Sequence, residues 1–277
     1  MKLSQSLLAL ATAAGLLVAG PALSAGKSVG VIDHDWSFEG PFGTFDRQQL
    51  QRGWQVYSEI CASCHSMDYL SFRNLGEPGG PEFPPEQVKA IAENWLYPVV
   101  TTDDEGEVLE RTPLPSDRIP GPFANREAAI AANGGAYPPD LSLITKARIG
   151  YNGIIKQVME GAGGPEYVYS LLLGYADEEP EGFDGGGLSY NRYFPGHRIA
   201  MGQPLYGDDV EYQDGTEATI EQHAADLVAF LTWAAEPKME ERKEAGVRNI
   251  ILLALFAVLL WYSNKTLWRP IKDGGQA

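Results

Sequence analysis

Two cysteines and a histidine stand close enough together to hold one cofactor. The chain has only two cysteines, Cys61 and Cys64, and His65 follows directly. On a helical turn, two cysteines three positions apart can each form a thioether with one vinyl group of a haem, and the next residue then lies under the iron. The motif therefore predicts one covalently attached haem c, with His65 as the proximal axial ligand.

Two other kinds of site share this cysteine spacing. A thioredoxin-like redox pair would follow a strand, whereas here a predicted helix runs into the motif and no strand precedes it. A zinc site would need two more cysteine or histidine ligands at matching spacing, and no such pair occurs elsewhere in the chain. A fold held together by disulfides would need more cysteines at wider separations. Haem attachment is the interpretation that remains.

The second axial ligand must come from five methionines or from the other histidines. Met201 lies in a loop framed by glycine and proline, far enough downstream to approach the opposite face of the haem. His197, four residues earlier in the same loop, is the alternative. Methionine ligation raises the reduction potential and fills the sixth position, so this choice predicts an electron carrier rather than an oxygen or peroxide enzyme.

The other methionines and histidines are expected to play other parts. Met67 is too near His65 in sequence to reach the opposite haem face, and Met159 lies in an apolar helical stripe that predicts core packing. Met1 leaves with the signal peptide, and Met239 lies among glutamates beside the apolar C-terminal segment. Ordinary surface or core positions are expected for His34 and His223.

Helices must position these ligands. Asp46 can cap a helix through Gln49, and the stripe that follows leads directly into the motif, through Leu50, Trp54, Tyr57 and Cys61. Further helices are expected over residues 86–95, 141–147, 151–161 and 166–175, and from Thr219 to shortly before Pro237, which ends that helix. The proline-rich stretch 76–125 predicts extended loops. The fold class is therefore mainly α, a c-type cytochrome domain with long loop insertions plus one C-terminal transmembrane helix.

Both ends of the chain carry targeting or membrane signals. Lys2, an apolar stretch and a small-residue region indicate a secretory signal peptide, cleaved after Ser24 or Ala25. Residues 250–262 are apolar, and Trp261, Tyr262 and Trp268 form an aromatic belt typical of a membrane interface. Because the signal exports the domain, we expect a single-pass protein of the bacterial inner membrane with its haem domain in the periplasm. The predicted boundaries are signal peptide 1–25, periplasmic haem domain 26–237, charged linker 238–246, transmembrane anchor 247–263 and cytoplasmic tail 264–277.

The charge balance restricts the partners. Acidic residues number 37 against 21 basic ones, for a net charge of −16. Such a chain is a poor nucleic-acid binder, because phosphate binding needs a basic surface. The acidic balance suits a cationic protein partner, steered by clusters such as 103–107 or 177–181, although acidity can equally serve solubility alone.

Several motifs, in fixed order, resemble the cytochrome c1 family. They are Phe42-Gly-Thr-Phe-Asp46, Cys61 to Met67, Ala136-Tyr-Pro-Pro-Asp-Leu-Ser142, Ala147-Arg148, Tyr193 to Met201, Asp214 to Thr219 and Trp233 to Pro237. The resemblance implies the haem subunit of ubiquinol–cytochrome c reductase, which is not an enzyme on its own. Its partners would be cytochrome b, a Rieske iron–sulfur protein that donates the electron and a soluble basic c-type cytochrome that accepts it, in a dimeric complex.

The resemblance also assigns residues. Cys61 and Cys64 would carry the thioethers, His65 and Met201 would be the axial ligands, and Arg148 would contact a haem propionate. The remaining pocket positions would be Tyr57, Asn133, Pro138, Pro139 and Tyr167. The alternatives are another anchored c-type cytochrome, such as a terminal oxidase subunit, or a monohaem peroxidase or nitrite-reducing enzyme with an open iron position.

Overall fold

The computed structural model describes residues 30–148, 150, 154–161, 163–176, 180–272 and 274. Val31–Ala277 form one compact unit. Most of its regular structure is helical, which confirms the predicted fold class. The helices are α2 (Arg47–Glu59), α3 (Pro85–Glu93), α4 (Arg126–Ala132), α5 (Ile144–Ala147), α6 (Ile154–Met159), α7 (Gly164–Leu172), α8 (Ile220–Ala235) and α9 (Met239–Lys272), with 3-10 turns η1 (Cys61–Ser63), η2 (Phe72–Gly76) and η3 (Pro195–His197).

The strands described are short and pair antiparallel, two to a sheet. β1 (Met67–Ser71) pairs with β4 (Arg118–Ile119), and β5 (Ser189–Tyr190) pairs with β6 (Arg198–Ile199). A hairpin of β2 (Val99–Thr102) and β3 (Val108–Arg111) lies within the stretch expected to be loop, and the sequence analysis did not predict it. Its strands are mostly exposed, so they lack the alternation of buried and exposed residues that identifies a strand in a sequence.

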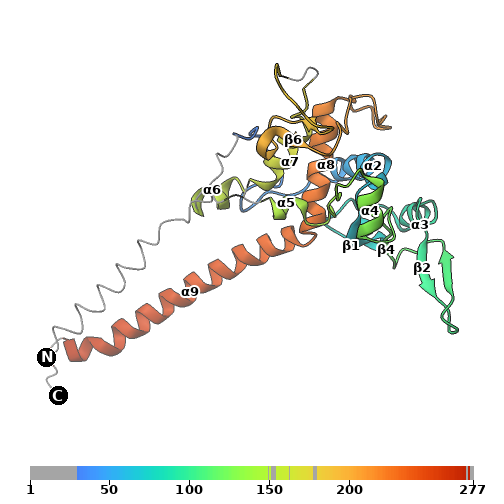
Figure 1. The fold of residues 1–277 in the computed structure, drawn as a ribbon. Helices are drawn as coiled ribbons and strands as arrows, with labels where there is room; N and C mark the ends of the chain where they lie inside the picture. Colours follow the sequence, from blue (N-terminus) through green and yellow to red (C-terminus); the bar gives the residue numbers. More distant parts are fainter. Residues whose placement is uncertain are drawn as a thin grey trace, which may run out of the picture. The chain divides into compact units, whose positions relative to one another are not determined.

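The core is centred on α8, which packs against α2, α5 and α7, as Figure 1 shows. Helix α2 begins as predicted, because the Asp46 carboxylate accepts a hydrogen bond from the Gln49 amide at 3.0 Å. Its buried residues include Trp54, whose ring lies against Phe230 of α8 at a centroid distance of 5.7 Å. This packing holds the end of α2, and therefore the cysteine turn after it, against the core.

The crossing of α2 and α8 is unusually close. A Cβ atom at Gly53 of α2 would lie 2.0 Å from the carbonyl oxygen of Asp226 in α8, so only glycine fits there. The neighbouring Arg52 donates to the Asp226 carboxylate at 2.8 Å, and Asp226 is fully buried. Arg52 also reaches Asp214 at 2.9 Å. A buried ion pair and a glycine contact therefore fix how the two helices cross.

The other helices lie near their predicted ranges but differ in length. Helix α3 matches the 86–95 prediction closely, α7 starts and ends slightly earlier than 166–175, and α5 covers only the second half of 141–147. For the range 151–161, α6 is described from Ile154, and residues 151–153 lie outside the described residues. Thr219 caps α8 through the Gln222 amide at 3.1 Å, and α8 ends two residues before Pro237.

Helix α9 is long and apolar enough to cross a membrane, with a mean hydropathy of 1.9 over its most apolar window. The side chains of that window are not covered by the rest of the described chain. The helix is continuous from Met239, so residues 239–246 of the expected charged linker are its first turns. Met239 itself is buried in the core, which ties the helix to the domain.

Candidate haem site

The two cysteines lie on one tight turn at the end of α2. After Glu59 the chain tightens into η1, where the amides of Cys64 and His65 both donate to the carbonyl oxygen of Cys61, at 3.1 and 2.8 Å. Both cysteines are free, and each residue is half-buried. This turn places two sulfur atoms and an imidazole on one short segment, as double thioether attachment beside an axial ligand requires.

The chemistry of the thiols argues against a redox or thiolate-ligand role. Burial raises the pKa of Cys61 to about 12, so this thiol stays protonated at neutral pH. Reactive and metal-binding cysteines need the opposite environment, one that stabilises a thiolate. Among the residues described there is also no group of three His, Cys, Asp or Glu side chains that could hold a metal ion directly. The donor set fits a thioether-linked haem better than either alternative.

His65 is oriented for ligation through one ring nitrogen. Its Nδ1 lies 2.8 Å from the carbonyl oxygen of Pro139, which makes Nδ1 the protonated nitrogen and leaves Nε2 with the lone pair. Burial lowers the pKa of His65, which favours the neutral imidazole that binds iron. The buried Tyr57 donates its hydroxyl to the His65 carbonyl at 3.2 Å. Tyr57 and Pro139, both predicted pocket residues, are thus brought to the ligand.

Asp140, which was not among the predicted site residues, joins the loop after His65 to the Pro138-Pro139 turn. Its carboxylate accepts hydrogen bonds from the Ser66 hydroxyl at 2.9 Å and from the Asp68 amide at 2.7 Å. The Leu141 amide donates to the Ser66 carbonyl at 2.9 Å, so the strand after His65 is bound to this turn on both sides. An acidic residue directly after Pro138-Pro139 was the available signal, because aspartate readily accepts amides in a turn.

Arg148 acts electrostatically on Tyr167, whereas Asn133 has a local role. Burial raises the pKa of the Tyr167 hydroxyl, and the charge of Arg148 partly opposes that rise. Arg148 is exposed, and the described part of the chain gives it no ion-pair partner, which suits an arginine that meets an anionic group such as a propionate. The Asn133 amide donates to the Ala129 carbonyl at 2.7 Å and ends α4. Pro138 is half-buried in the turn before Pro139.

Met201 is held by a half-buried tyrosine. The Tyr175 hydroxyl donates to the Met201 carbonyl at 3.0 Å, and the Met201 side chain is half-buried. The competing His197 is exposed, has a positive φ of 59° and stacks on Tyr190 at a centroid distance of 5.7 Å. Among the described residues, no hydrogen bond or ring contact joins Met201 to His65. Their pairing across a haem stays a prediction. Of the two candidate ligands in the loop, Met201 is less exposed than His197.

The remaining methionines divide between core and surface. Met67 is fully buried and Met239 is 6% exposed, so both are core residues. The prediction that Met159 packs in the core is wrong, because its side chain is 56% exposed. Helix α6 has only six residues, and the neighbouring Val158 is exposed as well. Of the histidines expected in ordinary positions, His223 is fully buried and His34 is half-buried.

Comparison with known proteins gives a consistent result. The sequence model of the Cytochrome C1 family matches residues 36–271. Cytochrome c1 of Cereibacter sphaeroides is 42% identical over 96% of each chain. The cytochrome b-c1 complex catalytic subunit of Candida albicans is 44% identical over 87% of this chain and 78% of its own. Cytochrome b/c1 of Bradyrhizobium diazoefficiens is 47% identical over 84% of this chain, which spans 35% of that relative's length.

Proposed function

This chain belongs to the cytochrome c1 family, and from that premise we propose that it is the membrane-anchored, monohaem electron-transfer subunit of a ubiquinol–cytochrome c reductase. It takes electrons from a Rieske iron–sulfur protein and passes them to a soluble c-type cytochrome. A cytochrome b completes the complex, which we propose to be dimeric. The Candida albicans relative is named as a subunit of a cytochrome b-c1 complex, which supports this assignment.

One observation carries the proposal, the hydrogen bond that holds His65 on the cysteine turn. With Nδ1 bound to the Pro139 carbonyl at 2.8 Å, Nε2 is the nitrogen available to iron. Cys61 and Cys64 would hold one haem c through thioethers, and His65 and Met201 would ligate its iron. The bound haem supplies a one-electron carrier whose potential depends on its axial ligands and surroundings.

The neighbouring residues orient the ligands and neutralise charge. Tyr57 keeps its proton, because burial raises its pKa well above the ordinary value, and it fixes the His65 backbone. The carbonyl of Pro139 sets the imidazole tautomer, and Pro138 stiffens the same turn. Arg148 would contact a haem propionate, and Tyr167 would line the pocket. These groups hold the site in one geometry, which limits the reorganisation that accompanies each electron transfer.

Helix α9 and the acidic surface have separate roles in this proposal. We propose that α9 spans a bacterial inner membrane, with the haem domain in the periplasm and the C-terminus in the cytoplasm. The cluster at residues 103–107 lies at the exposed tip of the β2–β3 hairpin, where it can attract a basic cytochrome. Of the second cluster, Asp177 to Glu179 lie outside the described residues.

Purification of the full chain from membranes tests the proposal. A haem c spectrum that survives denaturation, together with a cytochrome b and an iron–sulfur protein in the same preparation, is the expected result. Carbon monoxide should not bind the reduced native protein, because Met201 fills the sixth position. Carbon monoxide binding at full occupancy would instead favour an enzyme with an open iron site.

The rate of electron transfer to the acceptor cytochrome gives a second test of the proposal. Electron transfer to a cationic cytochrome should slow as ionic strength rises, because the Debye length shrinks to about 8 Å at physiological salt. A rate that does not change with salt would refute acidic docking while leaving the haem assignment intact.

A further inference from the structure

A loop of the haem domain is fastened to the first turns of α9. The Lys243 ammonium donates to the backbone carbonyls of Phe38 and Gly43, at 2.5 and 3.1 Å. The Glu240 carboxylate accepts from the Phe45 amide at 2.8 Å and binds Arg47. These contacts fix the height of the loop along the helix.

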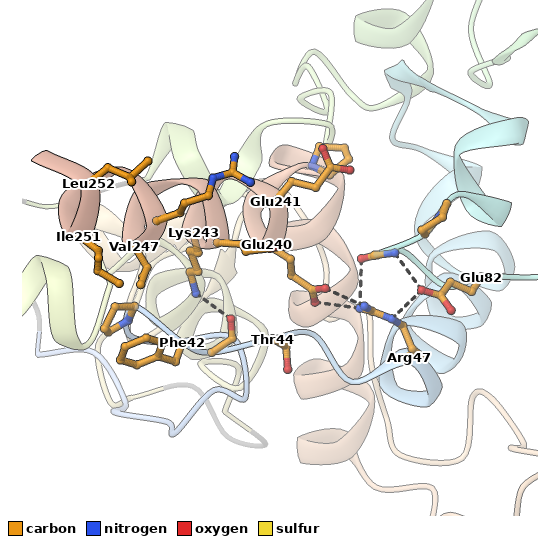
Figure 2. Close-up of a pocket in the computed structure, with 17 residues that line it drawn as sticks. Phe42, Thr44, Arg47, Glu82, Glu240, Glu241, Lys243, Val247, Ile251 and Leu252 are labelled. Atoms are coloured by element: carbon orange, nitrogen blue, oxygen red, sulfur yellow. Dashed lines mark hydrogen bonds and ion pairs between the residues drawn. The ribbon is translucent and has the colours of Figure 1, made fainter.

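Between this loop and α9 lies a groove of about 750 Å³, which Figure 2 shows. Its volume is within the range of roughly 300–1,000 Å³ that small-molecule sites occupy. The side chains of Val247 and Ile251 point from α9 towards the loop that carries Phe42. The ring of Phe42 is 79% exposed, so nothing in the described chain covers it. One wall of the groove is thus an aliphatic helix face and the other carries an aromatic ring.

The polarity along α9 changes in a definite order. Glu244, Arg248 and Leu252 all line the groove and are spaced four residues apart, so they lie one above another on a single face. Glu244 and Arg248 are exposed, and within the described residues neither has an ion-pair partner. Passing towards the apolar stretch, the helix therefore presents an anion, then a cation, then an aliphatic side chain.

The other charges around the groove are already satisfied. Arg47 is paired with Glu240 and Glu82, and Lys238, just outside, is paired with Glu241. Lys243 is engaged by the loop carbonyls. Glu244 and Arg248 therefore remain to bind a ligand. One acidic and one basic side chain favour a zwitterionic ligand over an anionic one.

We propose that this groove binds one phospholipid with an ethanolamine headgroup. Arg248 receives the phosphate, Glu244 receives the ammonium, and the acyl region lies along Val247, Ile251 and Phe42. The order of charges on α9 matches the order of groups in such a lipid, from ammonium to phosphate to acyl chain. The site lies where the charged first turns meet the apolar run, the depth at which a lipid headgroup meets a membrane helix. This inference rests on the proposed role of α9 as a membrane span.

The test uses the full haem-loaded chain, purified in detergent and depleted of lipid. Phosphatidylethanolamine and phosphatidylglycerol are titrated separately, and native mass spectrometry measures the bound fraction. We expect one high-affinity phosphatidylethanolamine and at least about tenfold weaker phosphatidylglycerol, since phosphatidylglycerol lacks the ammonium that pairs with Glu244. Arg248→Gln, Glu244→Gln and Phe42→Ser should each weaken the phosphatidylethanolamine site about tenfold.

Matched substitutions away from the groove provide the controls. Lys272→Gln, Glu105→Gln and Leu96→Ser change exposed residues of the same kinds and should leave lipid binding unchanged. Equal binding of both lipids, or unchanged binding in all three groove variants, would overturn the proposal. The three groove variants should also bind less phosphatidylethanolamine than the wild type in the intact membrane complex. If they bind less only as isolated chains, another subunit covers the groove in the complex, and the proposal is overturned.

Two further readouts separate this inference from the proposed function. The haem spectrum and the partition of the chain into membranes are recorded on the same wild-type sample. A sample with haem and membrane association but no bound lipid refutes the lipid site alone. A sample that lacks haem or stays out of membranes refutes the proposed function.

Discussion

Replacing Gly53 with alanine should destabilise the protein, although the residue lies inside a helix. From helix propensity alone, glycine to alanine should stabilise α2 by about 1 kcal/mol. The added Cβ, however, would lie 2.0 Å from the Asp226 carbonyl oxygen and 2.6 Å from the Cβ of Phe230. Both neighbours belong to α8, and the nearest atom is backbone, which cannot rotate away.

The magnitude follows from how far the helices must separate. Ordinary contact begins near 3.4 Å, so the two helices must move apart by more than an ångström at this crossing. Overpacking of this kind costs about 1–3 kcal/mol or more, and here it also strains the buried pair of Arg52 and Asp226. After the propensity gain is subtracted, we expect a net loss of about 2 kcal/mol. For a domain of this size that lowers Tm by roughly 4–8 °C.

Thermal unfolding of the haem-loaded chain, followed by circular dichroism and by the Soret band, measures the effect. Gly246→Ala is the matched control, because Gly246 also lies in a helix but has no atom within 4 Å of the added Cβ. It should leave Tm unchanged or slightly raised. A Gly53→Ala protein as stable as the wild type, with normal haem content, would refute the close crossing of α2 and α8.

Three other variants test the ion pair, the carboxyl pair and the distal ligand. Asp226→Asn should lower the free energy of unfolding by about 3 kcal/mol in denaturant titrations, since it removes the buried partner of Arg52; a loss below about 1 kcal/mol would contradict this. Burial and then a hydrogen bond with Glu166 raise the pKa of Glu39 from 4.5 to about 7, so the native state keeps a proton that the unfolded chain releases. The free energy of unfolding of the wild type should therefore fall as pH rises from about 4.5 to about 7. Because solvent screens this partly exposed carboxyl, we expect a fall on the order of 1–2 kcal/mol. Glu39→Gln should abolish this pH dependence. Met201→Leu should keep the haem attached but lower its reduction potential and admit carbon monoxide; an unchanged potential in redox titrations would move the ligand to His197 or elsewhere.

Some features of the site were readable from short segments of sequence. The spacing of Cys61, Cys64 and His65 needs only one turn of backbone, so it indicates haem attachment without any knowledge of the fold. The Asp46 cap and the stripe through Leu50 and Trp54 are equally local, and the structure confirms both the helix and its cap. The apolar run near the C-terminus predicted α9 for the same reason.

Features that depend on distant segments could not be read in this way. The prediction of core packing for Met159 failed because an apolar stripe shows which face of a helix can be buried, but not whether a neighbour lies against it. The β2–β3 hairpin was missed because both its strands are largely exposed, and the groove at Phe42 exists only because Lys243 fastens a loop some 200 residues away to α9.

The sequence by itself determined the haem motif, the helical class and the apolar C-terminal helix, because each depends on spacing within a few turns. Only the tertiary structure decided which nitrogen of His65 is available, since the carbonyl of Pro139 that fixes it lies 74 residues away. It likewise decided that position 53 must be glycine, because the constraint comes from the backbone of another helix. Local periodicity shows which side chains share a face, whereas a contact between distant segments depends on how the whole chain packs.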